Sequence, residues 1–361
     1  MRSVREVRRV RGATVRRVRP VAFALLLVSS AWPVMVEGQQ NNTLTAVGGL
    51  AVGHYTLAAR PTGCTVILAE PAAVAAVDVR GAAPGTRETD LLNPLNTVDR
   101  VNAIVLAGGS AFGLDAASGA VRWLEEHGRG FDVGVARVPI VPAAILFDLG
   151  VGDAHVRPDA DCGYRASAAA STGPVAEGSI GAGAGATVGK AFGLSRAMKS
   201  GIGSAAIRLP DGLVVSALVA VNAFGDVVDP ETGRTIAGVR TEDGKALADI
   251  RTLLRSGQIG GARPAAHTTL AVVATNAQLT KTQAAKVAQM AHDGFARAIV
   301  PVHTPVDGDT AFAVATGTLG RPADVLLVGS LAADVTAQAI VRAVREATGL
   351  PTLPAARDMP R

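Results

Sequence analysis

The first feature that could perform chemistry is a hydroxyl residue between a flexible run and a buried strand. Residues 257–266 contain three glycines and a proline, whereas residues 270–275 form a short apolar, β-branched run that predicts a core strand. Thr268 lies at the junction and could attack the carbonyl of His267. Hydrolysis of the resulting ester would make Thr268 a new N-terminus, whose α-amine could serve as the base for its own hydroxyl. The alternative interpretation is an ordinary loop that enters a strand.

Two carboxylates separated by a single glycine, Asp307 and Asp309, form a second candidate site. Residues two apart in an extended segment point to the same side, so both carboxylates could act on one reacting group. A solvated Asp-Gly-Asp turn is the competing interpretation.

A third candidate is Lys190, which follows the glycine-rich run 178–189. The run is not a nucleotide-binding loop, because its glycines lack the dinucleotide spacing. A phosphate-binding loop would also need glycine where Ala184 stands and Ser or Thr where Ala191 stands. We therefore expect a close approach of backbone segments that lines a pocket. Without further context, a single lysine is most often a surface residue.

Three longer motifs point to a known family. Residues 79–90, 108–119 and 303–317 resemble the motifs of the DmpA-type self-processing aminopeptidases, and they occur in the family's order. That family includes D-aminopeptidase/esterases, β-aminopeptidases and nylon-oligomer hydrolases. The threonine at the proposed cut and the Asp-Gly-Asp motif are most similar to the nylon-oligomer hydrolase branch.

The resemblance implies a role for each candidate residue. Thr268 would be the nucleophile, and Asp307 and Asp309 would orient and polarise its amine and hydroxyl. Lys190 would support the nucleophile and the developing charge. Asn222, at the end of an expected strand, would donate its side-chain amide to the oxyanion. Neither a cofactor nor a metal is implied, and the scattered histidines show no zinc-binding spacing.

The chain departs from the family pattern at two positions. Phe147 stands where several members carry a tyrosine, so a phenolic donor to the oxyanion is missing. His267 precedes the proposed cut, where relatives often have asparagine or glycine. The second departure bears on self-processing, because without the cut there is no free amine at Thr268.

Alternating short strands and helices with an antiparallel hairpin predict an α/β layered fold. The resemblance implies a four-layer αββα sandwich, as in the ornithine acetyltransferases. It also implies that the protein is an N-terminal-nucleophile hydrolase. We expect one composite catalytic domain in two parts, residues 39–267 and 268–361, assembled as a homo-oligomer of αβ units. The expected strands are 50–54, 65–68, 75–79, 103–106, 205–208, 214–221, 270–275 and 310–315, and the expected helices are 113–127, 245–255, 281–298 and 333–347.

The N-terminus reads as an export signal, because a basic region precedes the apolar run 21–36. Residues 1–38 would be removed, and the protein would be periplasmic or secreted. Alternatively, Met35 is the true start and the protein is cytoplasmic. Residues 1–20 hold eight arginines and one glutamate, and their net charge of +7 exceeds the formal net charge of +5 of the whole chain. The folded part is therefore not basic, and a nucleic-acid partner is not expected.

The predicted function is hydrolysis of amide bonds in small peptides, amino-acid amides or ω-amino-acid oligomers, through an acyl-enzyme on Thr268. One alternative is an acyltransferase of the ornithine-acetyltransferase type. Another is a catalytically silent binding relative. The sequence leaves open the choice among D-, L-, β- and ω-amino acids, and it also leaves open whether Cys64 and Cys162 pair.

Overall fold

The computed structural model describes residues 40–259 and 267–360, and residues 41–361 form one compact unit. The predicted signal segment 1–38, with its alternative start at Met35, lies outside the described residues. Residues 260–266, just before the proposed cut, also lie outside them.

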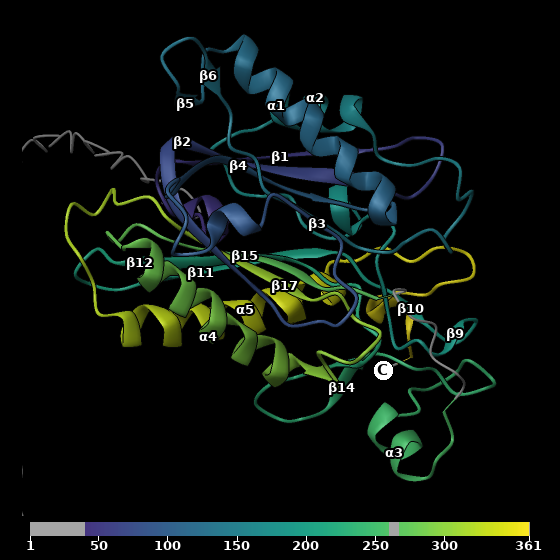
Figure 1. Ribbon diagram of the computed structural model, residues 1–361. Helices are drawn as coiled ribbons and strands as arrows, with labels where there is room; N and C mark the ends of the chain where they lie inside the picture. Colours follow the sequence, from purple (N-terminus) through teal and green to yellow (C-terminus); the bar gives the residue numbers. More distant parts are fainter. Residues whose placement is uncertain (1–39, 260–266, 361) are drawn as a thin grey trace, which may run out of the picture. The chain divides into compact units, whose positions relative to one another are not determined.

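Two β layers lie between two helical layers, in the order αββα (Figure 1). The main sheet follows the path β11-β12-β15-β17-β2-β4-β7-β3, with β1 paired to β2. The long strand β2 joins the layers, because its first half pairs with β1, its second half pairs with β17, and β4 pairs with parts of both halves. The bounds are β1 (Leu50–Thr56), β2 (Gly63–Val79), β3 (Thr86–Arg87), β4 (Arg100–Ala107), β7 (Ala143–Ile145), β11 (Ile202–Arg208), β12 (Val214–Ala220), β15 (Leu270–Thr275) and β17 (Thr310–Ala315).

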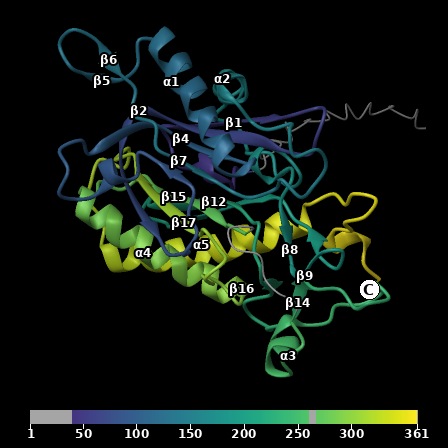
Figure 2. The same ribbon diagram turned by 45° about the vertical axis from the view of Figure 1, so that its right-hand side comes forward.

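Helices α1 (Ala116–Glu126) and α2 (Ala160–Ala168) cover one outer face of the sandwich, and α4 (Lys281–Ala298) and α5 (Val325–Arg345) cover the other (Figures 1 and 2). The predicted capping box opens α4: the Thr280 hydroxyl accepts from the Gln283 amide, and the Gln283 side chain accepts from the Thr280 amide. A short helix, α3 (Ile250–Arg255), stands apart from these layers.

The central strands of the sandwich have both faces buried, which explains why their sequences are continuous apolar runs. Val272 of β15 and Phe312 of β17 pack in the core between the two β layers. Their neighbours Val273 and Ala313 pack in the core beneath α4 and α5. Many core side chains are alanine or valine, so the layers pack closely on small residues. A disulfide between Cys64 of β2 and Cys162 of α2 links the sheet to its outer helix layer, with Cα atoms 6.2 Å apart.

The predicted strands 270–275 and 310–315 match β15 and β17 at both ends. Several other expected boundaries were wrong. The strands 65–68 and 75–79 are parts of the single strand β2, and helix 113–127 begins at Ala116 after a 3₁₀ segment. Helix 245–255 is limited to α3, because residues 241–246 form a hydrogen-bonded turn. Helix 333–347 begins at Val325, where the Asp324 carboxylate accepts from the Leu326 amide.

Smaller pairings complete the fold. A three-stranded sheet has the order β14-β13-β16, β8 pairs with β10, and β5 pairs with β6. Their bounds are β5 (Phe131–Asp132), β6 (Arg137–Val138), β8 (Thr187–Val188), β9 (Ala191–Leu194), β10 (Met198–Lys199), β13 (Asp226–Val228), β14 (Thr235–Ala237) and β16 (Ile299–Val300).

Candidate active site

The predicted site residues converge because three strands place their ends at the same edge of the sheet. Strands β15 and β17 are parallel neighbours, with Leu270 opposite Thr310, so the segments that precede them run side by side. His267 forms a bridge with Asp307 there. Strand β12 is antiparallel to β15, and Asn222 follows its C-terminal end.

The scissile peptide predicted from the sequence is buried in the uncut chain. The Thr268 hydroxyl donates a hydrogen bond to the carbonyl oxygen of His267. The same carbonyl oxygen accepts from the amide of Gly308 at 3.0 Å. A nucleophile, an electrophilic carbonyl and a donor to its oxygen are therefore in direct contact.

Gly308 was not recognised from the sequence as a site residue, although it lies between the two aspartates. A Cβ at this position would lie 2.6 Å from the Thr268 hydroxyl oxygen and 2.6 Å from the carbonyl oxygen of Ala83. Glycine therefore lets the amide reach the His267 carbonyl without displacing the Thr268 hydroxyl.

Asp307 and Asp309 are both buried, in contrast to a solvated turn. Asp307 accepts from the Phe224 amide at 3.3 Å and from the amide and hydroxyl of Thr304. Burial, followed by the charge of Asp309, raises the pKa of Asp307. Asp309 accepts from the Thr269 amide at 2.7 Å. Within the described residues, neither carboxylate is hydrogen-bonded to Thr268 itself. Asp309 instead binds the amide of the next residue, Thr269.

The 79–90 motif explains how the Asp-Gly-Asp segment is held in place. The Ala83 amide donates to the Asp307 carbonyl at 2.9 Å, and the amides of Arg80 and Gly81 donate to the Asp309 carbonyl at 3.0 and 3.2 Å. A Cβ at Gly81 would lie 2.3 Å from the Asp309 nitrogen, so the two backbones touch at this point.

Lys190 is buried rather than exposed, as is the Asn222 side chain to which it donates. Its ammonium nitrogen lies 2.6 Å from Asn222 Oδ1 and 3.3 Å from the Asn222 carbonyl oxygen. That carbonyl also accepts from the Thr268 amide at 2.9 Å, so the lysine and the Thr268 nitrogen share one acceptor. Burial lowers the pKa of Lys190 to about 7, although the charges of Asp307, Asp148 and Asp309 oppose this shift.

The Asn222 side chain is oriented by partners on both ends. Its Oδ1 accepts from Lys190 and from the Thr187 amide at 3.1 Å, which assigns Nδ2 as the donor. Nδ2 donates to the Phe147 carbonyl at 2.9 Å. In the uncut chain, one amide hydrogen is therefore engaged by Phe147, at the position where the family's tyrosine is missing.

The 108–119 motif supports this arrangement through Asp148. Its carboxylate accepts from the amide of Gly109 at 2.9 Å, the Thr62 hydroxyl at 2.6 Å and the Arg60 guanidinium at 2.7 Å. Cβ atoms at Gly108 and Gly185 would lie 2.2 and 2.5 Å from Asp148 Oδ2. The glycine-rich run thus packs its backbone against this buried ion pair, as expected for a close backbone approach.

The His267 side chain is buried, and both ring nitrogens lack a hydrogen-bond partner among the residues that the structure describes. The ring packs edge-on against Phe224, with centroids 5.4 Å apart. Burial, and then the charge of Lys190, lowers the pKa of His267 to about 2, so the ring is neutral at pH 7.

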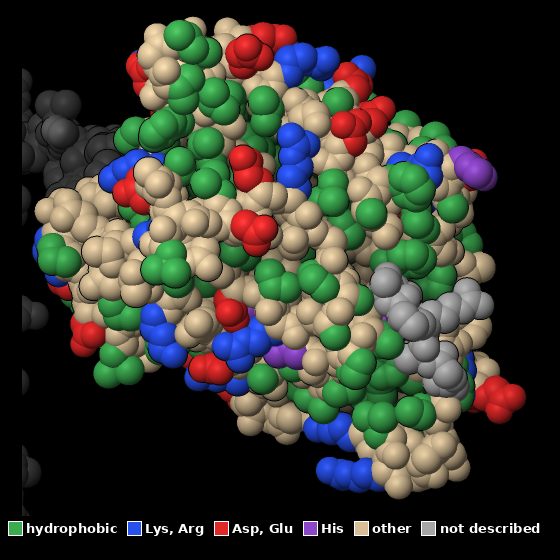
Figure 3. All heavy atoms as spheres, viewed as in Figure 1, with side chains coloured by type: hydrophobic (Ala, Val, Ile, Leu, Met, Phe, Trp, Pro, Cys, Tyr) green, Lys and Arg blue, Asp and Glu red, His purple; other side chains and the backbone are tan. Residues whose placement is uncertain are grey.

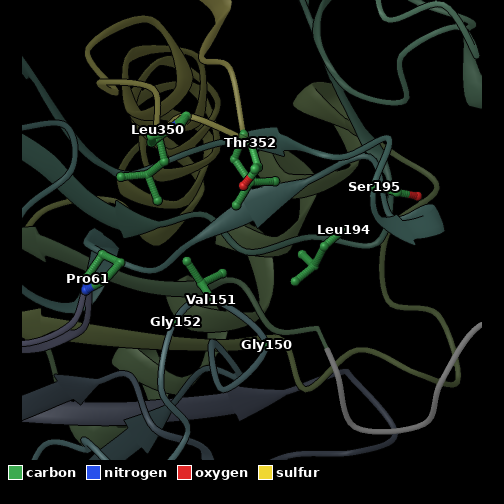
Figure 4. A pocket seen from close by; sticks show the side chains of 10 residues that line it. Pro61, Gly150, Val151, Gly152, Leu194, Ser195, Leu350 and Thr352 are labelled. Carbon is green, nitrogen blue, oxygen red and sulfur yellow. The ribbon is translucent and has the colours of Figure 1, made fainter.

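A cavity of about 670 Å³ is lined by residues that follow Phe147 and Lys190 in the sequence, but none of the predicted site residues lines it. It lies between the loop 150–152, the end of β9 and the C-terminal loop 350–353. Figure 4 shows the side chains of Val151, Leu194, Leu350 and Thr352 around it. The described residues that line it include no charged group suited to amide hydrolysis, so we do not assign the chemistry to it.

A match to one protein family covers most of the chain. The model described as peptidase family S58 matches residues 42–356. The chain belongs to peptidase family S58. It is therefore a hydrolase of peptide or amide bonds, and the predicted DmpA-type resemblance is confirmed.

Two similar proteins are named an aminopeptidase and an oligomer endohydrolase. An uncharacterized aminopeptidase of Mycobacterium tuberculosis is 44% identical over 88% of this chain and 98% of its own length. A 6-aminohexanoate-oligomer endohydrolase of Paenarthrobacter ureafaciens is 32% identical over 76% of this chain and 75% of its own.

Solved structures confirm the predicted fold class of this S58 member. A β-aminopeptidase from Burkholderia sp. superposes with a TM-score of 0.62 at 25% identity, covering 86% of this chain and 88% of the other. The L-aminopeptidase D-Ala-esterase/amidase of Ochrobactrum anthropi superposes with a TM-score of 0.65 at 19% identity, covering 88% and 91%. The second structure is described as a variant of the Ntn-hydrolase fold, and this likeness concerns the fold alone.

Proposed function

We propose that the protein cuts itself between His267 and Thr268 and then hydrolyses amide bonds with Thr268 as its nucleophile. The contact that carries the proposal is the one between the Thr268 hydroxyl and the His267 carbonyl, whose oxygen also accepts from Gly308. Attack would form a bond from Oγ1 to the carbonyl carbon and break the peptide C–N bond. Water would then hydrolyse the ester, leaving a carboxylate on His267 and an amine on Thr268.

In the mature enzyme the Thr268 amine accepts the proton of its own hydroxyl as that oxygen attacks the substrate carbonyl. The amine then returns the proton to the leaving amine, and water hydrolyses the acyl-enzyme. The Asn222 carbonyl holds the amine in place, because it already accepts from that nitrogen in the uncut chain. Lys190 adds positive charge beside the reacting groups.

The substrates that we propose are small peptides, amino-acid amides or ω-amino-acid oligomers. Support comes from relatives named aminopeptidases and 6-aminohexanoate-oligomer endohydrolases. The family is a peptidase family, which favours hydrolysis over the acyl transfer considered above.

The test is the intact mass of the denatured protein, together with activity on amino-acid anilides and 6-aminohexanoate oligomers. We expect two chains, the smaller beginning at Thr268, and a single inactive chain for Thr268→Ala. Thr269→Ala is the matched control and should still be cut. An uncut but active Thr268→Ala protein would contradict the proposal.

Export and oligomerisation are further parts of this proposal. The Cys64–Cys162 disulfide favours an oxidising compartment, in line with a signal segment at residues 1–38.

Hydrophobic side chains gather over the β5–β6 hairpin at the upper left of Figure 3, and Val135 there is 96% exposed. Such a patch suits a subunit contact. Periplasmic fractionation and light scattering of the purified protein test the two points separately.

A further inference from the structure

A row of hydrogen-bonding groups leads away from the catalytic segment through two histidines. Asp309 accepts from the Thr269 amide with Oδ1, and its Oδ2 accepts from His303, at 3.1 Å from the backbone nitrogen and 2.9 Å from ring Nδ1. His303 Nε2 lies 3.2 Å from His292 Nδ1. His292 Nε2 lies 3.1 Å from the Asp78 carbonyl oxygen on β2. None of the roles considered above uses either ring.

The number of hydrogens on the two rings follows from their partners. The Asp309 carboxylate and the Asp78 carbonyl only accept, so His303 Nδ1 and His292 Nε2 must each carry a hydrogen. Two neutral imidazoles have no further hydrogen, and the remaining two nitrogens would then face each other with lone pairs at 3.2 Å. A third hydrogen completes every contact in the row. The arrangement therefore fits a pair of rings that carries one positive charge.

The surroundings decide which ring carries that charge. His292 is 3% exposed, and burial lowers its pKa to about 4, although the hydrogen bond to the Asp78 carbonyl opposes this shift. The side chain of His303 is 19% exposed and touches the Asp309 carboxylate directly. A neutral His292 with its hydrogen on Nε2 can accept from His303 at Nδ1.

We infer that His303 is an imidazolium that positions Asp309, with neutral His292 as its acceptor. This inference rests on the proposed function for the importance of Asp309 beside Thr268. The backbone supports it, because His303 has a φ of 53° and its own amide bonds the same carboxylate oxygen. Such a left-handed conformation is uncommon for residues other than glycine, although asparagine, aspartate and histidine are enriched in it.

The charged groups around the two histidines determine how the protonation of Asp307 should depend on pH. Asp309 faces His303, and Asp78, held by Arg80 at 2.7 Å, faces His292 with its carboxylate 3.4 Å away. The charge of Asp309 already raises the pKa of Asp307. Without the imidazolium, Asp309 loses the cation that touches its carboxylate, so its negative charge acts more strongly on Asp307, which should take up a proton at higher pH.

The test compares two substitutions at one position. His303→Asn places an amide donor near the position of Nδ1 and tolerates the left-handed backbone, but it carries no charge. His303→Ala removes both the donor and the charge. We expect His303→Ala to lower kcat roughly 10- to 100-fold with little change in KM. His303→Asn should recover most of that loss, with the acid limb of its pH profile moved to higher pH.

The control is His292→Asn, whose Oδ1 can replace the acceptor Nδ1, and its acid limb should stay near that of the wild type. Wild-type kcat in His303→Ala would overturn the inference. An unshifted acid limb in His303→Asn would overturn it as well.

A second measurement needs no activity and separates this inference from the proposed function. Long-range ¹H–¹⁵N correlation spectra of the full-length Thr268→Ala protein report the hydrogens on each ring nitrogen. At neutral pH we expect His303 to carry hydrogens on both nitrogens and His292 only on Nε2. A neutral His303 in this spectrum would overturn the assignment, whatever the protein cleaves.

Discussion

The amide nitrogen of Gly308 lies 3.0 Å from the carbonyl oxygen of His267, on the peptide that we propose is cut. In an acyl shift this oxygen gains negative charge, and a backbone donor already aimed at it stabilises the transition state without reorganisation. A residue between two candidate catalytic aspartates would thus serve the proposed cleavage through its main chain.

Gly308→Ala should leave most of the chain uncut, because the new Cβ would push the Thr268 hydroxyl or Ala83 away. Displacing an oxyanion donor is expected to slow cleavage roughly 100-fold or more. Intact mass as a function of time measures this rate. Gly173→Ala is the control, since its Cβ would meet only the Ser171 hydroxyl, at 3.8 Å. Equal cleavage rates in the two variants would argue against a role for the Gly308 amide.

Lys190 and Asn222 should behave as one functional unit. Lys190→Met removes the cation that orients the Asn222 side chain, and Asn222→Ala removes the group that it orients. Each change is expected to lower kcat roughly 100-fold, and the double variant should lose little more than either single one. A double-mutant cycle on the fraction that has been cut measures the coupling. Fully additive losses would show that the two side chains act separately.

Two buried lysines predict how the free energy of unfolding should change with pH. Burial lowers the pKa of Lys190 and of Lys199 from 10.5 to about 7. Between these values the unfolded chain binds more protons than the folded one, so the free energy of unfolding should rise with pH. Below pH 7 both states hold the proton, and the cost of burying the charges is fully present.

Urea unfolding of the uncut Thr268→Ala protein at pH 7 and pH 9 measures this effect, and Lys199→Met should reduce the difference. Lys199 donates to the carbonyls of Gly183, Ala186 and Ser200, so this variant should also be less stable at both pH values. A free energy of unfolding that falls from pH 7 to pH 9 would refute the prediction.

The disulfide between Cys64 and Cys162 closes a loop across 98 residues of sequence and is buried at both ends. Replacing both cysteines by alanine should lower the free energy of unfolding by about 2–4 kcal/mol. Urea unfolding with and without a reductant is the measurement. The reductant should destabilise the wild type and leave the double variant unchanged. A wild type that is insensitive to reductant after unfolding and refolding would mean that the bond contributes little.

Local pattern was sufficient for the parts of this protein that depend on neighbouring residues. The apolar runs of β15 and β17 and the capping box at Thr280 are visible in the sequence, because strand burial and helix capping involve residues close together in the chain. Thr268, Asp307 and Asp309 could be selected because their residue types and spacing suit the chemistry. The four-layer arrangement came from the family resemblance, since periodicity does not specify which strands become neighbours.

Only the tertiary structure decided how these groups meet. The parallel pairing of β15 with β17 brings His267 beside Asp307 across 40 residues of chain, and the end of β12 brings Asn222 to the same edge. Burial lowers the pKa of Lys190 to about 7, which a single lysine after a glycine-rich run does not by itself indicate. The roles of Gly308 and His303 depend on a backbone amide and a ring nitrogen that face distant partners. Such contacts leave no periodic mark in the sequence, because they arise from the packing of whole layers.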